Sequence, residues 1–427
     1  MASLKVLMMG GQRVGKSSAL AAIMDAFLSG AEKDILTAND TTTLAKVDGE
    51  KQTSIGSKLQ EVKDMLRGNV GKTILVNSGK TNKKWDYNLE LTLTGTNESM
   101  TITFTDVNGE FFEGGNVHQD EIIKLVQSYD VFIVAIDTPF MMESRNDDSD
   151  LVDSVINKEY NCALSIHTFL TQINDSDGND AKLVIFTPIK CEYWAKRNQL
   201  DNVVAAVLED YSTSIKALRK YKSVQIEILP VQTVGSAVFE EHLEALICEW
   251  TEKIFLFFNK SCSSKCGLLK DGRIRLANGE IKDRDSLAKI QEDLEAVLIP
   301  DTDIVRPNSW FRIESKEYKP HNCEQLALHI LEFMLAKVVD AKIKKEEQQN
   351  PILRGIRIAA NFILNVGTLG LWEKLCDLFG EISVEQMQSA MKKLEEKNLI
   401  KHSGEGITIP QFRNPTKSLR ALRPKPP

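Results

Sequence analysis

The feature that most constrains this chain is the segment from Gly10 to Ser17, which matches the pattern G-x-x-x-x-G-K-[ST] at every defined position. The apolar residues 4–9 in front of it predict a short buried strand, and residues 17–28 behind it predict a helix. A tight glycine loop between a strand and a helix directs several backbone N–H groups and the positive end of the helix dipole at one point. The sequence therefore predicts a phosphate-binding loop, and the flanking strand and helix argue against a chance glycine loop.

Each position of this loop has an expected role toward a bound nucleotide. We expect the Lys16 ammonium to reach the β- and γ-phosphates and the Ser17 hydroxyl to bind Mg²⁺. The other residues expected to surround the phosphates are Gly10, Gly11, Gln12, Arg13, Val14, Gly15 and Ser18.

Length and composition limit the classes of protein that this chain can be. Its 427 residues predict two or three domains, and its net charge of −7 argues against binding nucleic acid through the charge of the whole chain. Seven cysteines without a regular framework fit a reducing compartment, so we expect a cytoplasmic protein in which Cys262 and Cys266 are free thiols. We expect no leader before the first strand and no segment that spans a bilayer, since no uninterrupted apolar run is long enough.

The region between the first helix and the next strand is long and polar. Residues 30–80 are rich in Thr, Asn, Lys and Gly, although 53–66 have apolar residues at helical spacing, and a loop of this length is usually functional or mobile. Apolar and polar residues then alternate over 85–93 and again over 100–104, around a turn at 95–98. We therefore predict an antiparallel hairpin, which makes one edge of the sheet run backwards.

After the hairpin the chain alternates between buried strands and helices. The pattern predicts strands over 130–136, 182–187 and 224–231 and helices over 121–127, 151–173 and 200–218. This alternation indicates an α/β fold with a doubly wound, mostly parallel sheet, in which ligands bind at the carboxyl ends of the strands. The candidate site residues follow those ends.

The second hairpin strand ends in a carboxylate. Asp106 is expected to help hold Mg²⁺, because an acidic residue at this point of a phosphate-loop fold serves the metal. Gly109 lets a backbone N–H approach the γ-phosphate, since it has no Cβ in the way. An ordinary Asn-Gly turn after a strand is the alternative interpretation.

A second carboxylate follows the strand over 182–187. Glu192 could accept hydrogen bonds from both N1 and N2 of guanine, whereas the N1 acceptor of adenine would repel the same group. The aliphatic stem of Lys190 can lie on the face of the base, and Gln232 and Thr233 begin a loop beside it. A solvated surface pair of Lys190 and Glu192 is the alternative.

Together these segments resemble the P-loop GTPases of the translation-factor-related (TRAFAC) class. They are most similar to a bacterial small-GTPase-like branch found in multi-gene, conflict-type operons, over residues 4–260 and a later helix. The resemblance implies binding of GTP and GDP with Mg²⁺ and places the family motifs at 10–17, 106–109 (D-x-x-G), 189–192 (N-K-x-D) and 232–235 (the last base-contacting loop). It also implies a first-switch threonine that binds Mg²⁺, for which Thr81 fits best and Thr73 is second.

The chain departs from the family pattern in ways that bear on catalysis. Ile189 and Glu192 replace the Asn and Asp of N-K-x-D, Gln12 would crowd the attacking water, and Glu110 stands where relatives carry a water-orienting Gln. Arg13 could supply an arginine in cis, with a structural or solvent-facing role as the alternative. The candidates for catalysis are Lys16, Glu110 and Arg13. We expect slow hydrolysis that a partner protein accelerates.

The remaining sequence predicts an insertion and a C-terminal module. We expect helices over 239–258, 287–297 and 320–339 and a hairpin over 261–283. The predicted domains are the GTPase core (1–260), the insertion (261–315), the last core helix (316–345), a helical, winged-helix-like module (346–410) and a basic disordered tail (411–427).

The C-terminal module is expected to contact proteins. A helix of mixed charge over 383–397 and a two-stranded wing around 404–406 form a combination that binds DNA or protein, and the mixed charge favours protein. Residues 352–372 are expected to pack on a partner or on the core, with a membrane surface as the alternative. The basic residues of the tail leave weak binding of nucleic acid open.

We therefore expect a GTP-binding, slowly hydrolysing switch that acts through partner proteins in a bacterial multi-component system, of which anti-phage defence is one kind. One alternative is an ATP-dependent assembly or remodelling ATPase, which the departures at 189–192 leave open. The other is a scaffold that binds nucleotide without hydrolysis, which Gln12 and Glu110 favour.

Overall fold

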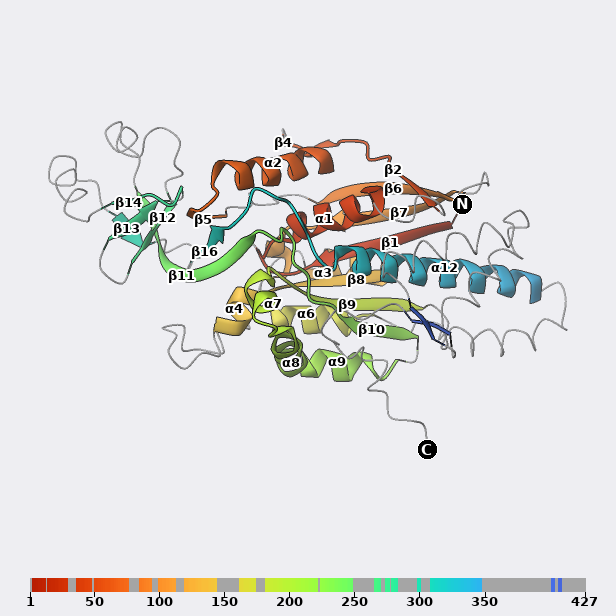
Figure 1. The fold of residues 1–427 in the computed structure, drawn as a ribbon. Coiled ribbons are helices and arrows are strands. Elements are labelled where there is room, and N and C mark those ends of the chain that lie inside the picture. The colour runs from red at the N-terminus through yellow and green to blue at the C-terminus, as the bar shows by residue number, and fades with distance from the viewer. Residues whose placement is uncertain are drawn as a thin grey trace.

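The protein is organised around a seven-stranded sheet with the strand order β10-β9-β8-β1-β7-β6-β2 (Figure 1). The computed structural model describes residues 2–12, 14–29, 36–47, 50–76, 84–93, 99–112, 119–143, 161–173, 181–221, 223–248, 265–269, 273–276, 278–282, 298–300, 308–347, 401–403 and 406–408. The strands of the sheet are β1 (Ala2–Met9), β2 (Leu36–Asp40), β6 (Trp85–Leu93), β7 (Ser99–Asp106), β8 (Val131–Asp137), β9 (Lys182–Ile189) and β10 (Val224–Ile228).

The directions of these strands confirm the predicted α/β class. All pairs from β10 across to β7 are parallel, whereas β6 pairs antiparallel with both β7 and β2. The predicted hairpin therefore exists and turns one edge of the sheet backwards. The sequence did not predict β2, which lies in the polar region 30–80 and extends that edge by one strand.

Helices cover both faces of the sheet, because side chains of β1 point alternately to two apolar cores. Leu4, Val6 and Met8 belong to the first core, while Leu7 and Met9 belong to the second. The first face is covered by α1 (Lys16–Ser29), the start of α2 (Ile55–Gly68) and α12 (Cys323–Glu347). The second face is covered by α3 (Gln119–Ser128), α4 (Thr138–Glu143), α6 (Ala163–Leu170), α7 (Glu192–Lys196), α8 (Leu200–Asp210) and α9 (Ser212–Leu218).

Two helices on the second face differ from the predicted ones. The sequence predicts one helix over 151–173, whereas α6 begins only at residue 163, after Cys162 in a left-handed conformation (φ 52°) that a helix cannot include; residues 151–160 lie outside the described part. The sequence also predicts one helix over 200–218, which is in fact α8 and α9. The break falls at Tyr211, whose buried side chain donates to the Asn161 carbonyl.

A second, antiparallel sheet has the order β14-β13-β12-β11-β16-β5, with β15 also paired to β11. Its strands are β5 (Thr73–Leu75), β11 (Ala237–Cys248), β12 (Lys265–Leu268), β13 (Ile274–Leu276), β14 (Ile281–Lys282), β15 (Leu298–Pro300) and β16 (Asn308–Ile313). The hairpin predicted over 261–283 is confirmed as β12 and β13. This sheet joins two distant parts of the chain, because β5 comes from the region 30–80 and the other strands lie within 237–313 (Figure 1).

The predicted helix over 239–258 is wrong for residues 239–248, which form most of β11. Their run of Glu, Leu and Ala favours a helix locally. Pairing of β11 with β16 on one side and with β12 and β15 on the other overrides that propensity, as tertiary context often does. Residues 249–258 lie outside the described part.

Other predicted elements have mixed outcomes. The helix over 320–339 is confirmed as α12, which packs on α1, and the helix within 53–66 is confirmed as α2. The short hairpin of β17 (Lys401–Ser403) and β18 (Gly406–Thr408) agrees with the predicted wing. A further hairpin joins β3 (Lys46–Val47) and β4 (Glu50–Lys51). The predicted helices over 287–297 and 383–397, the segment 352–372 and the tail 411–427 lie outside the described residues.

Within the described residues, no helix combines the length and the apolar character needed to cross a membrane.

Gly235 marks a close approach between two segments that flank the first sheet. Gln232 and His321 form a two-way backbone bridge, and the Lys319 N–H donates to the Val234 carbonyl. Gly235 has φ 82°, and a Cβ added there would lie 1.9 Å from the Lys319 carbonyl oxygen. The segment that leads into α12 can therefore lie this close only because residue 235 is glycine.

We predict that Gly235→Ala lowers the free energy of unfolding by more than about 1–2 kcal/mol, the penalty for a side chain in the left-handed region, because the clash adds to it. Urea denaturation measures the loss. Gly56→Ala is the matched control, since nothing lies within 4 Å of a Cβ at this helical position, and it should leave stability unchanged or slightly higher. Equal stability of the two variants would contradict the prediction.

Candidate functional site

The parallel strands bring the candidate segments to one edge of the first sheet. Met8 pairs with Asp106 across β1 and β7, and Asp137 pairs with Ile189 across β8 and β9. The loop after β1 therefore lies between the end of β7 and the end of β8. Carboxyl ends of parallel strands are where such sheets bind ligands.

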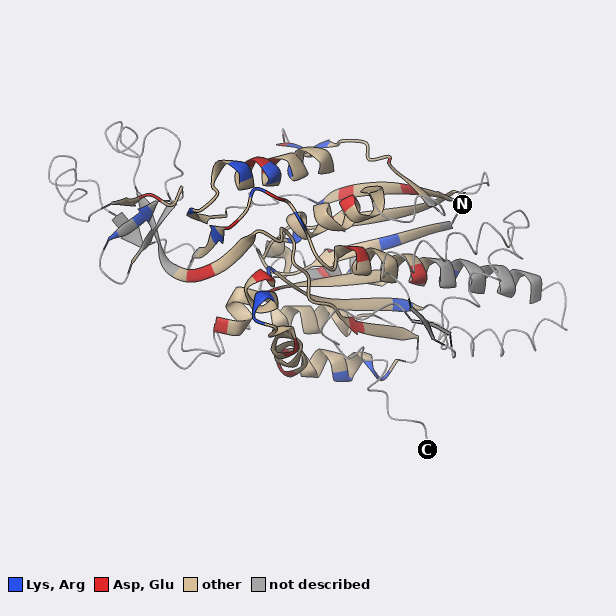
Figure 2. Cartoon of the chain, viewed as in Figure 1, with Lys and Arg blue, Asp and Glu red and all other residues tan. Residues whose placement is uncertain are grey.

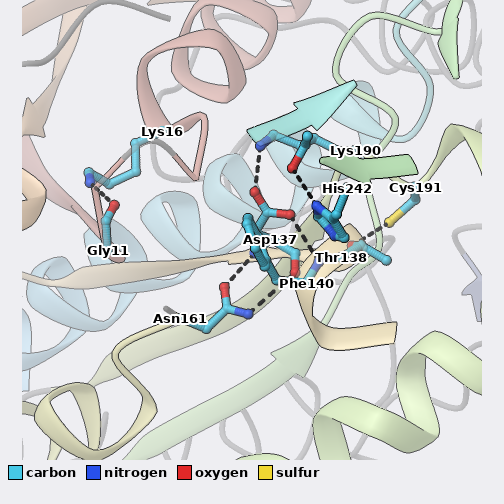
Figure 3. Close-up of polar contacts among 10 residues, drawn as sticks. Gly11, Lys16, Asp137, Thr138, Phe140, Asn161, Lys190, Cys191 and His242 are labelled. Atoms are coloured by element: carbon cyan, nitrogen blue, oxygen red, sulfur yellow. Dashed lines mark hydrogen bonds and ion pairs between the residues drawn. The ribbon is translucent and has the colours of Figure 1, made fainter. Parts of the chain in front are cut away.

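The phosphate loop connects β1 directly to α1, as its motif predicts. Lys16 is buried, and its ammonium donates to the carbonyl oxygens of Gly10 (2.8 Å) and Gly11 (2.7 Å). Figure 3 shows the side chain reaching back toward Gly11. These carbonyls accept hydrogen bonds from the buried ammonium. The ammonium is thereby held beside the backbone that would surround a phosphate.

Asp106 and Ser17 meet at the point where the resemblance places a metal. The Ser17 hydroxyl donates to Asp106 Oδ2 at 2.5 Å, and the Asp106 side chain is fully buried. Its other oxygen, Oδ1, has no hydrogen-bond partner among the described residues. A buried carboxylate oxygen without a partner fits a hard cation or the water that such a cation carries, so these residues suit Mg²⁺.

The D-x-x-G glycine lies against the phosphate loop. A Cβ added to Gly109 would lie 2.3 Å from the backbone nitrogen of Gln12 and 2.5 Å from the carbonyl carbon of Gly11. Only glycine therefore permits this approach of η2 (Gly109–Phe112) to the loop. The backbone after β7 is thus within reach of the same space that the loop surrounds.

The end of β9 forms the other side of the loop. A Cβ at Gly15 would lie 3.2 Å from Ile189 Cδ1 and 3.4 Å from Lys190 Cε, so both side chains pack on the loop. Ile189 makes this contact through carbon alone. Lys190 itself has a left-handed backbone (φ 61°).

Lys190 pairs with Asp137, a residue that the sequence analysis missed. The Lys190 ammonium lies 2.5 Å from Asp137 Oδ2, and the Asp137 side chain is only 2 % exposed (Figure 3). Asn161 holds the backbone of Asp137 from the other side, because its amide accepts from the Asp137 N–H and donates to the carbonyl. Asp137 could have been found by the argument used for Asp106, since it also ends a buried strand.

Glu192 connects the two segments expected beside the base. Its carboxylate is 1 % exposed, and Oε1 accepts from the N–H groups of Val234 (3.0 Å) and Gly235 (3.1 Å). The other oxygen, Oε2, takes part in neither bond. Burial raises the pKa of Glu192, and the two backbone hydrogen bonds oppose that rise. Thr233 is buried in the same loop, and Gln232 is half-buried.

Several predicted site residues are not placed at this edge. Arg13 and Thr81 lie outside the described residues, and so does the side chain of Glu110. Thr73 lies in β5 of the second sheet, where its hydroxyl donates to Glu240. Ser18 follows Ser17 in the first turn of α1, and Val14 is buried within the loop.

The second sheet reaches Lys190 at the end of β9. The Phe311 ring of β16 lies 5.7 Å from the Lys190 ammonium, and His242 of β11 stacks on Phe140 of α4 at 4.3 Å. Burial of the imidazole lowers the pKa of His242 to about 3, so this ring is neutral at physiological pH. The second sheet therefore meets this edge with the aromatic rings of Phe311 and His242.

Comparison with solved structures gives a weak likeness to a GTPase-like domain. The chain is similar to the Ski7 GTPase-like domain of S. cerevisiae, in crystal structures bound to GDP with inorganic phosphate (14% identity, TM-score 0.26) and to GTP (16% identity, TM-score 0.28). Both matches cover 54% of this chain and 43% of the Ski7 chain, so this chain spans less than half the length of that neighbour. No protein-family model and no curated protein sequence matches the chain. Likeness at this level carries no conclusion about what the chain binds.

We predict that Asp137→Asn destabilises the protein by about 1.5–3 kcal/mol, because it leaves the Lys190 ammonium without its charged partner in a buried setting. Chemical denaturation of Asp137→Asn, Lys190→Met and the double variant gives the coupling between the two side chains. Lys196→Met is the control, since Lys196 forms an exposed ion pair with Glu314 and should change stability by less than about 1 kcal/mol. Additive effects of the two single variants would contradict the prediction.

Proposed function

We propose that this chain binds a guanine nucleoside triphosphate with Mg²⁺ and hydrolyses it slowly, as a switch whose states differ in the γ-phosphate. The observation that carries the proposal is the Ser17–Asp106 hydrogen bond beside the phosphate loop, with Asp106 Oδ1 buried and free of any described partner. A serine after the loop lysine and an acidic strand end are the two protein groups that hold Mg²⁺ in phosphate-loop proteins.

The phosphates have a defined set of protein groups to meet. The backbone of the loop and the N-terminus of α1 supply N–H donors, and Lys16 supplies a positive charge at the β- and γ-phosphates once it turns from the carbonyls of Gly10 and Gly11. Gly109 brings the backbone after β7 to the same space, where an N–H can meet the γ-phosphate. Mg²⁺, held by Ser17 and, through water, by Asp106, would neutralise charge on the phosphate oxygens.

The base side supports guanine through Glu192 and Lys190. Oε1 of Glu192 fixes the loop at 232–235, and Oε2, which takes part in neither of those two bonds, is the candidate acceptor for the N–H groups of a base. Guanine presents two adjacent donors to a carboxylate, whereas adenine presents an acceptor beside a donor. The stem of Lys190, fixed between the phosphate loop and Asp137, is placed to cover the face of the base.

Slow hydrolysis follows from the residues that would surround the attacking water. Glu110 stands in place of a water-orienting glutamine, and Gln12 puts a bulky side chain into the loop. Arg13 is the candidate for a charge supplied in cis. A partner that supplies an arginine would then raise the rate by ~10³–10⁵.

Partner proteins would distinguish the nucleotide states by binding elements that contact the site, such as the second sheet. The second sheet includes β5 from the region 30–80 and places Phe311 beside Lys190, so it can respond to both sides of the site. The C-terminal module is the other candidate contact surface. A role in a bacterial multi-component system, such as anti-phage defence, rests on the sequence resemblance alone.

One observation favours ATP as a second candidate. Burial raises the pKa of Glu192, and a protonated carboxyl group offers one donor and one acceptor, the pattern that adenine N1 and N6 require. An ATP-dependent assembly or remodelling factor is therefore the alternative to the GTP switch. A scaffold that binds nucleotide without hydrolysing it is the third interpretation of the same site.

Titration of nucleotide-free protein with fluorescent GTP and ATP analogues tests the base assignment. We predict at least about tenfold tighter binding of GTP, strengthened by Mg²⁺ and abolished by Lys16→Ala. Glu192→Gln should erase the preference while keeping an acceptor for the loop at 232–235. The preference should grow as pH rises through the pKa of Glu192, because the ionised form accepts both guanine donors.

The control for this titration is Glu314→Gln, which changes an exposed carboxylate and should leave the preference intact. Equal or tighter binding of ATP by the wild-type chain would reject guanine and favour the ATPase. Binding of neither nucleotide would reject the proposed function.

Steady-state phosphate release tests the rate. We predict Mg²⁺-dependent hydrolysis of GTP well below about 1 s⁻¹ for the isolated chain, lost in Lys16→Ala and after chelation of Mg²⁺, because no arginine in trans is present. Lys216→Met, on the exposed surface of α9, should retain the wild-type rate. Turnover of tens per second would contradict the switch.

A further inference from the structure

We propose that the Lys58 ammonium neutralises the Asp106 carboxylate in the metal-free protein. Mg²⁺ that binds with nucleotide would then displace this ammonium from the site. The inference rests on the proposed function and adds a regulating residue to the same site. It was not foreseen from the sequence, because Lys58 lies in the polar region between the phosphate-loop helix and β6.

The position of Lys58 is set by α2. The Ser54 hydroxyl caps this helix by accepting from the Ser57 N–H, while Ile55 and Leu59 bury the helix on the first core. Lys58 lies between these two anchors, and its side chain is 18 % exposed. Figure 2 shows α2 as one of the more highly charged helices of the molecule.

The ammonium of Lys58 lies 4.0 Å from Asp106 Oδ2, the oxygen to which Ser17 donates. The same ammonium lies over the ring of Tyr87 on β6, 5.1 Å from the ring centroid, so the aromatic face also attracts its positive charge. Among the described residues, Lys58 is the one positive side chain that forms an ion pair with Asp106. It comes from the region 30–80, which we expect to respond to nucleotide.

A metal and this ammonium would compete for the same carboxylate. Mg²⁺ held by Ser17 and linked to Asp106 would bring two positive charges to within a few ångströms of the third, and like charges at that distance in a partly buried site repel strongly. The ammonium therefore stabilises Asp106 before the metal arrives and opposes the metal afterwards. Binding of Mg²⁺ would therefore require the Lys58 ammonium to leave Asp106.

Backbone hydrogen bonds connect the segment after α2 to the second sheet. Beyond the end of α2, the Gly71 N–H donates to the Ile313 carbonyl (2.7 Å), and the Ile313 N–H donates to the Lys72 carbonyl (2.9 Å). Ile313 ends β16, whose neighbour β5 follows Lys72. These backbone hydrogen bonds tie the segment after α2, the helix that carries Lys58, to the edge of the second sheet.

The test is a Mg²⁺ titration of binding of a fluorescent, non-hydrolysable GTP analogue to the full-length chain. We expect Lys58→Met to lower the Mg²⁺ concentration at half-maximal binding by on the order of fivefold to tenfold, with affinity at saturating Mg²⁺ within about twofold of wild type. Lys63→Met is the matched control on the same helix, since Lys63 lies over Tyr318 and has no described contact with Asp106. It should change neither quantity.

Two outcomes of this titration overturn the proposal. An unchanged Mg²⁺ midpoint in Lys58→Met means that Lys58 does not compete with the metal. Weaker analogue binding at saturating Mg²⁺ means that Lys58 binds phosphate instead. Failure of the wild-type chain to bind nucleotide at all is a different result, which rejects the proposed function and this inference together.

A second measurement reports on Lys58 without relying on activity. Acetylation by a soluble N-hydroxysuccinimide ester, read by mass spectrometry, should be several-fold slower at Lys58 in the metal-free wild type than in the presence of Mg²⁺ and analogue, or in Asp106→Asn without metal. The rate at Lys63 should stay constant and shows that the variant remains folded. Equal rates at Lys58 in all three samples would overturn the proposal.

Discussion

The parallel pairing of β1 with β7 on one side and β8 on the other is the constraint on which the rest of the structure depends. The register puts Met8 beside Asp106 and Met9 beside Val134, so the phosphate loop leaves β1 between two strand ends. Because side chains of these strands fill two apolar cores, a shift of one residue would exchange the faces and is strongly disfavoured. The Ser17–Asp106 contact is therefore a consequence of sheet register.

Much of the first sheet and the strand, loop and helix at residues 2–29 could be predicted from the sequence, because both depend on short-range patterns. Alternation and uninterrupted apolar runs give the strands, and the spacing of glycine, lysine and serine gives the loop. The failures arise where long-range contacts decide. Residues 239–248 favour a helix locally yet form β11 by pairing with β16, and the predicted helix over 200–218 is interrupted at Tyr211, whose hydroxyl donates to the Asn161 carbonyl. Lys58 was missed because its partner Asp106 lies far away in the sequence, whereas Asp137 ends a buried strand as Asp106 does and was within reach of the same argument.

The two sides of the site differ in how their charges are arranged. On the phosphate side, Asp106 retains an oxygen without a described partner, and two positive side chains, Lys16 and Lys58, lie within the loop and against the carboxylate. On the base side, Asp137 and Glu192 are both occupied, the first by Lys190 and the second by backbone N–H groups. The groups around Asp106 are thus arranged to exchange charge with a ligand, whereas those around Asp137 and Glu192 are largely prearranged, and Phe311 of the second sheet lies beside Lys190.

The central claim is that four separate segments form a single site for Mg²⁺ and a guanine nucleotide. Hydrogen–deuterium exchange of the full chain, with and without a non-hydrolysable GTP analogue and Mg²⁺, tests it most directly. The account predicts slower exchange at residues 10–18, 106–112, 189–193 and 232–236 together in the wild type, and no change in Lys16→Ala. Unchanged exchange in the wild type, or protection of the phosphate loop without the segments at 189–193 and 232–236, would contradict it.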